Sequence, residues 1–291
     1  MKKILVPVDF SNHTDITCRY ALEFGRAYGA EIRLFHTYFD QIIIADTSFP
    51  DTLDMSTMYN EELMKEIFRQ AERNMEELKE KINDLIVKEH LENITIVSQV
   101  AGGEIEHELN MLCHEYHPDL VVMGTTGKGN NLNVWGKVST YIIDHAKVPV
   151  ITVPDIRSFH GFQTIMVATD LTDDSASIIS NLFLLFEPFQ FRLKVVHFMT
   201  KGRHSDEYDR MKALQQKFGK EEKANLIDFE MVEVADDNQK AIDHYVVEKK
   251  IDLIVFRPHK HSLLSLVFTR NITKKNLFAA NVPLLAIPKA V

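Results

Sequence analysis

The chain has few cysteines, no long apolar run and no excess of basic residues, and each absence argues against a class of protein. Among its 291 residues the only cysteines are Cys18 and Cys113, which lie in separate amphipathic stretches. We therefore expect no disulfide framework, and we expect a reducing, cytoplasmic location. No stretch approaches the roughly 18 to 20 apolar residues of a membrane span. The opening run MKKILVPVDF breaks at Pro7 and Asp9, too early for a signal-peptide core, so we expect a soluble protein with no membrane partner.

Basic residues do not dominate the composition. The formal net charge of −9 argues against a nucleic-acid partner, because such binding depends on basic patches that face phosphate. With 45% hydrophobic and 26% charged residues, the chain is globular and long enough for two cores of ordinary size.

Glycine is scarce, and four of the eleven glycines lie between Gly124 and Gly136. The apolar run 120–123 before them is typical of a strand, and residues 138–145 after them can form a helix. In the order strand, glycine loop, helix, backbone N–H groups and a helix N-terminus can bind phosphate. The spacing fits neither GxxxxGK[ST] nor GxGxxG. Spacing alone therefore leaves a phosphate-binding loop and a plain strand-to-helix turn equally open.

Strand-like and helix-like stretches alternate through the first half of the chain. Strands are predicted at residues 3–8, 31–38, 94–100, 119–123 and 148–153, and helices at 15–28, 60–90, 105–116 and 138–145. Residues 40–58 have no clear period and are predicted to be irregular. This alternation favours right-handed crossovers and a parallel sheet covered on both faces, which is an α/β fold.

The pattern then repeats. TIMVATDLTDDSA restates KILVPVDFSNHTD, with Asp9 and Asp170 lying 161 residues apart, whereas Pro149 and Pro283 lie 134 apart. The first half therefore carries about 27 extra residues, 161 less 134, around residues 40–65. Repeats joined by a short segment flanked by breakers are typical of tandem domains.

We predict two tandem, doubly wound, parallel five-stranded sheets, in domains at residues 1–154 and 162–291. Their last strands, residues 148–153 and 283–287, would each leave an unpaired edge. We therefore expect these edges to pair, so that the halves form an intramolecular pseudo-dimer, while association of two chains into a homodimer stays open. Residues 41–58 are predicted to be a lid or an interaction element, whose deletion leaves the fold intact.

The order of motifs resembles the universal stress protein family. VPVDFS follows the first strand, LFH ends the second, DLVVMGTTGKG follows the fourth, and VPVITVP closes the half. The chain looks like a tandem member, and the resemblance covers nearly all of it. It implies a Rossmann-like fold of the adenine nucleotide alpha hydrolase type and a role in the stress response.

The resemblance also implies which residues would contact ATP or a related adenine nucleotide. They are Pro7, Asp9 and Thr37 around the adenine and ribose, Met123, Gly124 and Gly127 under the ribose and phosphates, and Gly136, Lys137 and Val138 at the phosphate end. The family pattern is G-x-x-G, nine residues, then G-[ST]. Here eight residues separate Gly127 from Gly136, and Lys137 replaces the Ser or Thr. A lysine can still meet a phosphate as a point charge. For Asp9 the alternative role is a helix N-cap, the role that we expect of Asp170.

The matching loop of the second half, FRPHKHSLLSLVFTRNITKK, contains no glycine. Arg257 and Pro258 replace the backbone that would approach phosphate, so this half should not bind nucleotide. His259 and His261 are interpreted as exposed polar residues, and no metal site is expected. His36 and His197 are interpreted as packed residues at strand ends.

Three classes of function remain open. The first is a stress-response regulatory protein that binds ATP in its first domain only and is sensed by an unknown protein partner. The second is a non-nucleotide-binding structural or interaction protein of the same fold. The third is an enzyme or phosphorelay receiver. No phosphoacceptor Asp ends the third strand and no nucleophile–base pair is visible, so we predict no catalytic residue and no enzyme, slow ATP hydrolysis aside.

Overall fold

The computed structural model describes residues 1–38, 53–125, 137–155, 159–200, 202, 205–234, 238–258, 267–269, 272–273, 277 and 279–288. The first half contains β1 (Lys3–Pro7), α1 (Thr14–Tyr28), β2 (Glu31–Tyr38), α2 (Leu53–Lys88), β3 (Thr95–Gly102), α3 (Ile105–Tyr116), β4 (Leu120–Gly124), α4 (Lys137–His145) and β5 (Val150–Val153). The second contains β6 (Thr164–Ala168), α5 (Ser175–Leu185), β7 (Arg192–Thr200), α6 (Ser205–Lys217), α7 (Gly219–Lys223), β8 (Ile227–Val234), α8 (Asn238–Glu248), β9 (Leu253–Phe256), β10 (Val267–Thr269), β11 (Ile272–Thr273) and β12 (Leu284–Ala286).

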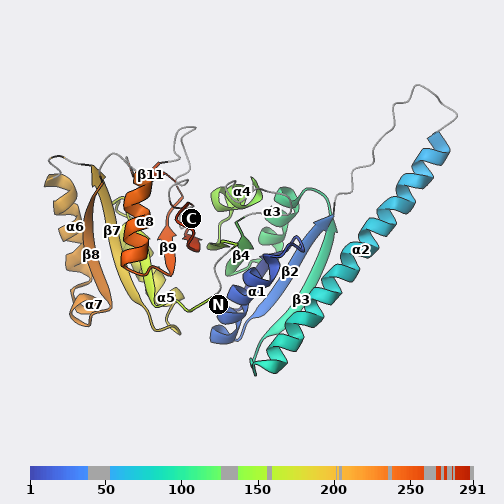
Figure 1. Cartoon of the computed structure of the whole chain (residues 1–291), viewed down its shortest axis with the longest axis horizontal. Helices are drawn as coiled ribbons and strands as arrows, with labels where there is room; N and C mark the ends of the chain where they lie inside the picture. The colour runs from blue at the N-terminus through green and yellow to red at the C-terminus, as the bar shows by residue number, and fades with distance from the viewer. Residues whose placement is uncertain are drawn as a thin grey trace.

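Ten strands form one sheet in the order β3-β2-β1-β4-β5-β12-β9-β6-β7-β8 (Figure 1). Within each half all neighbouring strands are parallel, and the two halves meet where β5 and β12 pair antiparallel, with Ile151 beside Leu285. The predicted α/β class and the predicted pairing of the two final strands are therefore confirmed. The two five-stranded sheets are joined into one continuous sheet.

The antiparallel junction sets the direction of each half. Because β12 runs opposite to β5 and is parallel to β9, all strands of the second half run opposite to those of the first. The carboxyl ends of the two sets of strands therefore lie at opposite edges of the sheet. Open α/β sheets bind ligands at carboxyl ends, so the two candidate sites are well separated.

Both faces of the sheet are covered, as strands that are apolar along their whole length require. Successive side chains of a strand point to opposite faces: Ile4 and Val6 pack in the core beneath α1, α2 and α5, whereas Leu5 packs in the core beneath α3, α4 and α8. Each core continues across the junction of the halves.

An aromatic cluster covers the junction on the α1 side. Phe162, which is 3% exposed, lies at its centre, with ring centroids 4.9 to 6.1 Å apart among its members. The members come from both halves and from the segment between them: Tyr20, Phe24, Phe159, Phe162, Phe186 and Phe189. Most pairs meet edge to face, a favoured aromatic geometry. The cluster holds α1 against α5.

One prediction about the elements is wrong. Residues 53–58 were predicted to be irregular but form the start of α2, whose N-terminal end extends past the strands (Figure 1); residues 39–52 lie outside the described residues. In the second half β10 and β11, which follow β9, pair antiparallel as a separate two-stranded sheet. Among the described helices, none is both long and apolar enough to cross a membrane.

Candidate functional site

The carboxyl edge of the first half has a switch in strand order between β1 and β4. From β1 the chain continues to β2 on one side, whereas β4 lies on the other, with Ile4 beside Leu120. Strands that diverge in this way leave a crevice at their carboxyl ends, where ligands of open α/β folds bind. Pro7 ends β1 and Gly124 ends β4, so both lie at this crevice.

In the loop after β1, the side chain of Asp9 is held by nearby hydrogen-bond donors. Asp9 Oδ1 accepts hydrogen bonds from the Ser11 N–H at 3.1 Å and the Thr14 hydroxyl at 3.4 Å. Phe10 between them has φ +55°, a conformation that non-glycine residues seldom adopt and that often occurs at functional sites. The N-cap position of α1 is occupied by His13, whose side chain makes no capping hydrogen bond. The N-cap alternative for Asp9 is therefore wrong.

The same loop recurs in the second half. Asp170 Oδ1 accepts the Thr172 N–H at 3.2 Å, Leu171 has φ +57°, and the N-cap of α5 is Asp174. The N-cap prediction for Asp170 is therefore also wrong. Both aspartates shape a tight turn, in which the side chain bonds a backbone N–H two residues on.

Two histidines fasten these loops to the neighbouring strands. Nδ1 of His36 lies 2.7 Å from the Val8 carbonyl, and Nδ1 of His197 lies 2.8 Å from the Thr169 carbonyl. A carbonyl only accepts, so each Nδ1 carries the proton. The ring of His36 also packs on Phe10, with centroids 4.4 Å apart. The prediction that both histidines are packed strand-end residues is confirmed.

Thr37 lies near the end of β2, on the other side of β1 from β4. It lines a cavity of about 310 Å³ with Gly103, Glu104, Ile105 and Glu106. The cavity opens at the same carboxyl edge, because Thr37 pairs with Ala101 near the end of β3. Thr37 and Asp9 therefore border neighbouring parts of one edge.

The end of β4 continues toward α4. Met123 is buried, Gly124 pairs with Val153 of β5, and the Thr125 N–H donates to the Val153 carbonyl at 3.0 Å. The buried hydroxyl of Ser139 donates to the Thr125 carbonyl at 3.2 Å. The Ser139 side chain therefore ties α4 to the residue that follows β4.

Other predicted site residues lie in or beside α4. Lys137 is its first residue, and Val138 is half-buried against the core on that face. Gly127, Gly136 and the side chain of Lys137 lie outside the described part of the chain. Pro7, Asp9, Thr37, Met123, Gly124 and Val138 all lie at the carboxyl ends of β1, β2 and β4 or on the helix that follows β4.

A contact between a histidine and an aspartate at this edge was missed from the sequence. Nε2 of His13 lies 3.2 Å from Oδ2 of Asp155, with the two side chains 30% and 10% exposed. The residues are far apart in the sequence, so no local spacing could pair them. The repeat marks only the position of His13, because it aligns His13 with Asp174, and it gives no signal for Asp155.

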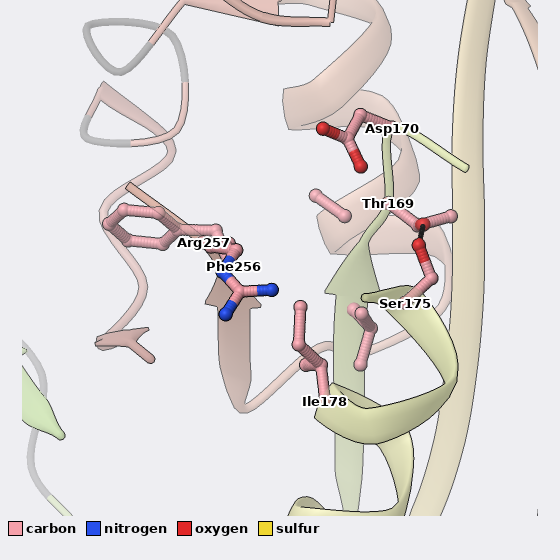
Figure 2. Close-up of a pocket in the computed structure, with 8 residues that line it drawn as sticks. Thr169, Asp170, Ser175, Ile178, Phe256 and Arg257 are labelled. Carbon is pink, nitrogen blue, oxygen red and sulfur yellow. Dashed lines mark hydrogen bonds between the residues drawn. The ribbon is translucent and has the colours of Figure 1, made fainter. Parts of the chain in front are cut away.

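The second half has the same switch between β6 and β9, with Ile165 beside Leu253. The repeat aligns Gly124 with Arg257, whose side chain is 10% exposed. Figure 2 shows its guanidinium between the end of β9 and the side of Ile178. Nη1 lies 2.6 Å from Oδ2 of Asp174, yet neither Nε nor Nη1 has a hydrogen-bond acceptor among the described residues.

The side chains that line the pocket around Arg257 leave little free space in it. Thr169 and Ser175, which also line it, bond each other at 2.9 Å (Figure 2). Its enclosed space, about 10 Å³, is about what one water occupies. Across the described part of both halves, no group of three or more His, Cys, Asp or Glu side chains could hold a metal ion.

Comparisons with known proteins agree with this architecture. The model of the universal stress protein family matches residues 1–154 and again residues 161–288. Universal stress protein MJ0577 of Methanocaldococcus jannaschii is 25% identical over 159 residues, which cover 52% of this chain and 94% of that protein.

Solved structures show the same fold over nearly the whole chain. A universal stress protein from Archaeoglobus fulgidus has a TM-score of 0.64 at 15% identity, covering 98% of this chain and 96% of its own. The functionally unknown protein PA1789 from Pseudomonas aeruginosa has a TM-score of 0.66 at 13% identity, covering 99% and 92%. With the family matched twice in sequence, the chain belongs to the universal stress protein family as a tandem member with two copies of its domain.

Proposed function

We propose that the chain is a stress-response regulatory protein that binds ATP or a related adenine nucleotide in its first domain only. The proposed domains are residues 1–154 and 162–291. The observation that carries the proposal is the contrast at the two switch points. The first has Gly124 at the end of β4, and the second has the buried Arg257 at the equivalent position.

The proposed contacts follow the edge of the first half. Pro7, Asp9 and Thr37 would surround the adenine and ribose, and Met123, Gly124 and Gly127 would lie under the ribose and phosphates. Gly136, Lys137 and Val138 would meet the phosphate end. Because the Ser139 hydroxyl is bonded to the Thr125 carbonyl, the phosphate is met by backbone N–H groups of α4 and the charge of Lys137.

No catalytic residue is part of the proposal. The ligand acts as a signal, because its binding would change the surface that this edge presents to a protein partner. The strand β4 pairs with β5, which joins the sheet of the second domain through β12. Only β5 therefore separates the end of β4 from the first strand of the second domain in the sheet, β12.

Titration calorimetry of ATP into the full chain tests the proposal. We expect at most one site per chain, lost in a Gly127→Val variant because a side chain there blocks the approach of phosphate. The control is Gly219→Val, since a Cβ at Gly219 meets nothing within 4 Å. Two sites per chain, or unchanged binding by Gly127→Val, would contradict the assignment. Absence of binding and of copurified nucleotide would favour an interaction protein that binds no nucleotide.

A further inference from the structure

The ion pair between His13 and Asp155 lies against the end of β4. His13 precedes α1 and so follows β1, whereas Asp155 lies two residues after β5. In the sheet β4 lies between β1 and β5. A 3.2 Å contact between these two side chains therefore spans the carboxyl end of β4, on the face covered by α1. Gly124, the last residue of β4, has no side chain.

The second half shows how far the residue at this position reaches. The 161-residue offset that relates Asp9 to Asp170 aligns His13 with Asp174. Asp174 lies 2.6 Å from the guanidinium of Arg257, which the register of β9 aligns with Gly124. The residue before the first helix thus reaches a charged group carried by the end of the fourth strand.

The side chains before the first helix of each half, His13 and Asp174, differ in the charge that they can carry. In the second half a carboxylate at position 174 faces a cation at position 257. In the first half the imidazole of His13 occupies the corresponding position, and β4 ends in Gly124, which carries no charged side chain. A ligand group on Gly124 that is complementary to His13 would therefore be an anion, because an imidazole N–H donates and its protonated form is positive.

We propose that His13 is a phosphate-contacting residue of the first site, and that a bound nucleotide competes with Asp155 for its imidazole. This inference rests on the proposed function. It adds a residue outside the glycine loop and a reason for Asp155, whose carboxylate holds the ring in place until phosphate arrives. It also connects the site to the segment between the domains, because Asp155 begins that segment.

The proposal requires that two variants of one ion pair change affinity in opposite directions. His13→Ala removes a charge-assisted hydrogen bond to phosphate, so the Kd for ATP should rise about tenfold while that for adenosine stays the same. Asp155→Asn removes the competing anion, so ATP should bind about threefold more tightly. His13→Gln, which keeps a neutral donor, should lie between the parent and His13→Ala.

Calorimetry with ATP and adenosine on the full chain measures these constants, and thermal unfolding shows that each variant is folded. His244→Ala is the matched control, because His244 has a similar 3.3 Å pair with Glu248 on the exposed side of α8. If the pair only stabilises the loop, both variants weaken ATP and adenosine alike. That result, or ATP binding by the parent that His13→Ala leaves unchanged, overturns the inference and leaves the proposed function standing. No ATP binding by the parent chain overturns both.

Discussion

The hydroxyl of Tyr28 donates a hydrogen bond to the backbone carbonyl of Leu185 at 2.6 Å. Each residue is the last of the first helix in its half, so this bond joins the two domains at a second place besides the strand pair β5–β12. Burial, and to a lesser extent the nearby Glu187, raises the pKa of the Tyr28 hydroxyl. The hydroxyl therefore stays a donor at alkaline pH.

We predict that Tyr28→Phe lowers the free energy of unfolding by about 1 kcal/mol, because the carbonyls of Leu184 and Leu185 lose their shared donor. Tyr208→Phe, at a side chain that is 52% exposed, should change stability by less than about 0.5 kcal/mol. Urea unfolding measures both. An equal effect of the two substitutions would show that the bond between the helices contributes nothing.

Phe162 tests the aromatic cluster between the halves. We expect Phe162→Ala to destabilise the chain by about 3 to 5 kcal/mol, because it opens a cavity among side chains of both domains. Phe162→Leu, which keeps most of the volume, should cost less. Thermal unfolding followed by circular dichroism reports both values. A small loss for the alanine variant would mean that the cluster rearranges to fill the space.

The ion pair between Asp174 and Arg257 in the second half should respond differently to removal of either partner. Asp174→Asn should destabilise the chain by about 1 to 3 kcal/mol, because it leaves the guanidinium of Arg257, whose side chain is 10% exposed, without its counter-charge. Arg257→Met should cost less, or even stabilise, because the guanidinium nitrogens Nε and Nη1 have no hydrogen-bond acceptor among the residues that the structure describes. Chemical denaturation of the two variants compares them. The reverse ranking would show that Arg257 contributes more than its pairing with Asp174.

Cys18 predicts how stability depends on pH. It lies beside Leu22 and Ile82 in a groove of about 360 Å³ between α1 and α2, and burial, with a smaller effect of Asp15, raises the pKa of its thiol from 9.0 to about 12. Above pH 9 the unfolded chain loses this proton while the folded chain keeps it. Stability contributed by the neutral thiol is therefore fully present below pH 9 and is lost toward pH 12.

The measurement compares the parent with Cys18→Ala by urea unfolding between pH 7 and pH 11. The difference in unfolding free energy between the two proteins should shrink as the pH rises. Iodoacetamide at pH 8 should also modify Cys18 slowly in the folded chain and quickly in urea. A constant difference across this range, together with fast modification of the folded protein, would show that the thiol is accessible and ionised.

Much of the fold was predictable from the sequence, because burial leaves a local pattern. Continuous apolar runs such as Ile4–Val6 indicate strands covered on both faces, and the match between Asp9 and Asp170 indicates the repeat. Even the edges that join the halves were predictable, since β5 is apolar and would otherwise be unpaired. The start of α2 was not, because residues 53–58 lack the helical apolar period on which the prediction depended.

The candidate site was likewise predictable only in part from the sequence. By itself the sequence determined which residues end the strands, and so that Asp9, Thr37 and Gly124 share one edge once the sheet is parallel. Only the tertiary structure decided that His13 meets Asp155, that Arg257 is buried against Asp174, and that Ser139 bonds the Thr125 carbonyl. The physical reason is that spacing along a chain encodes which face of an element is buried, whereas a contact between elements depends on how their ends converge in space.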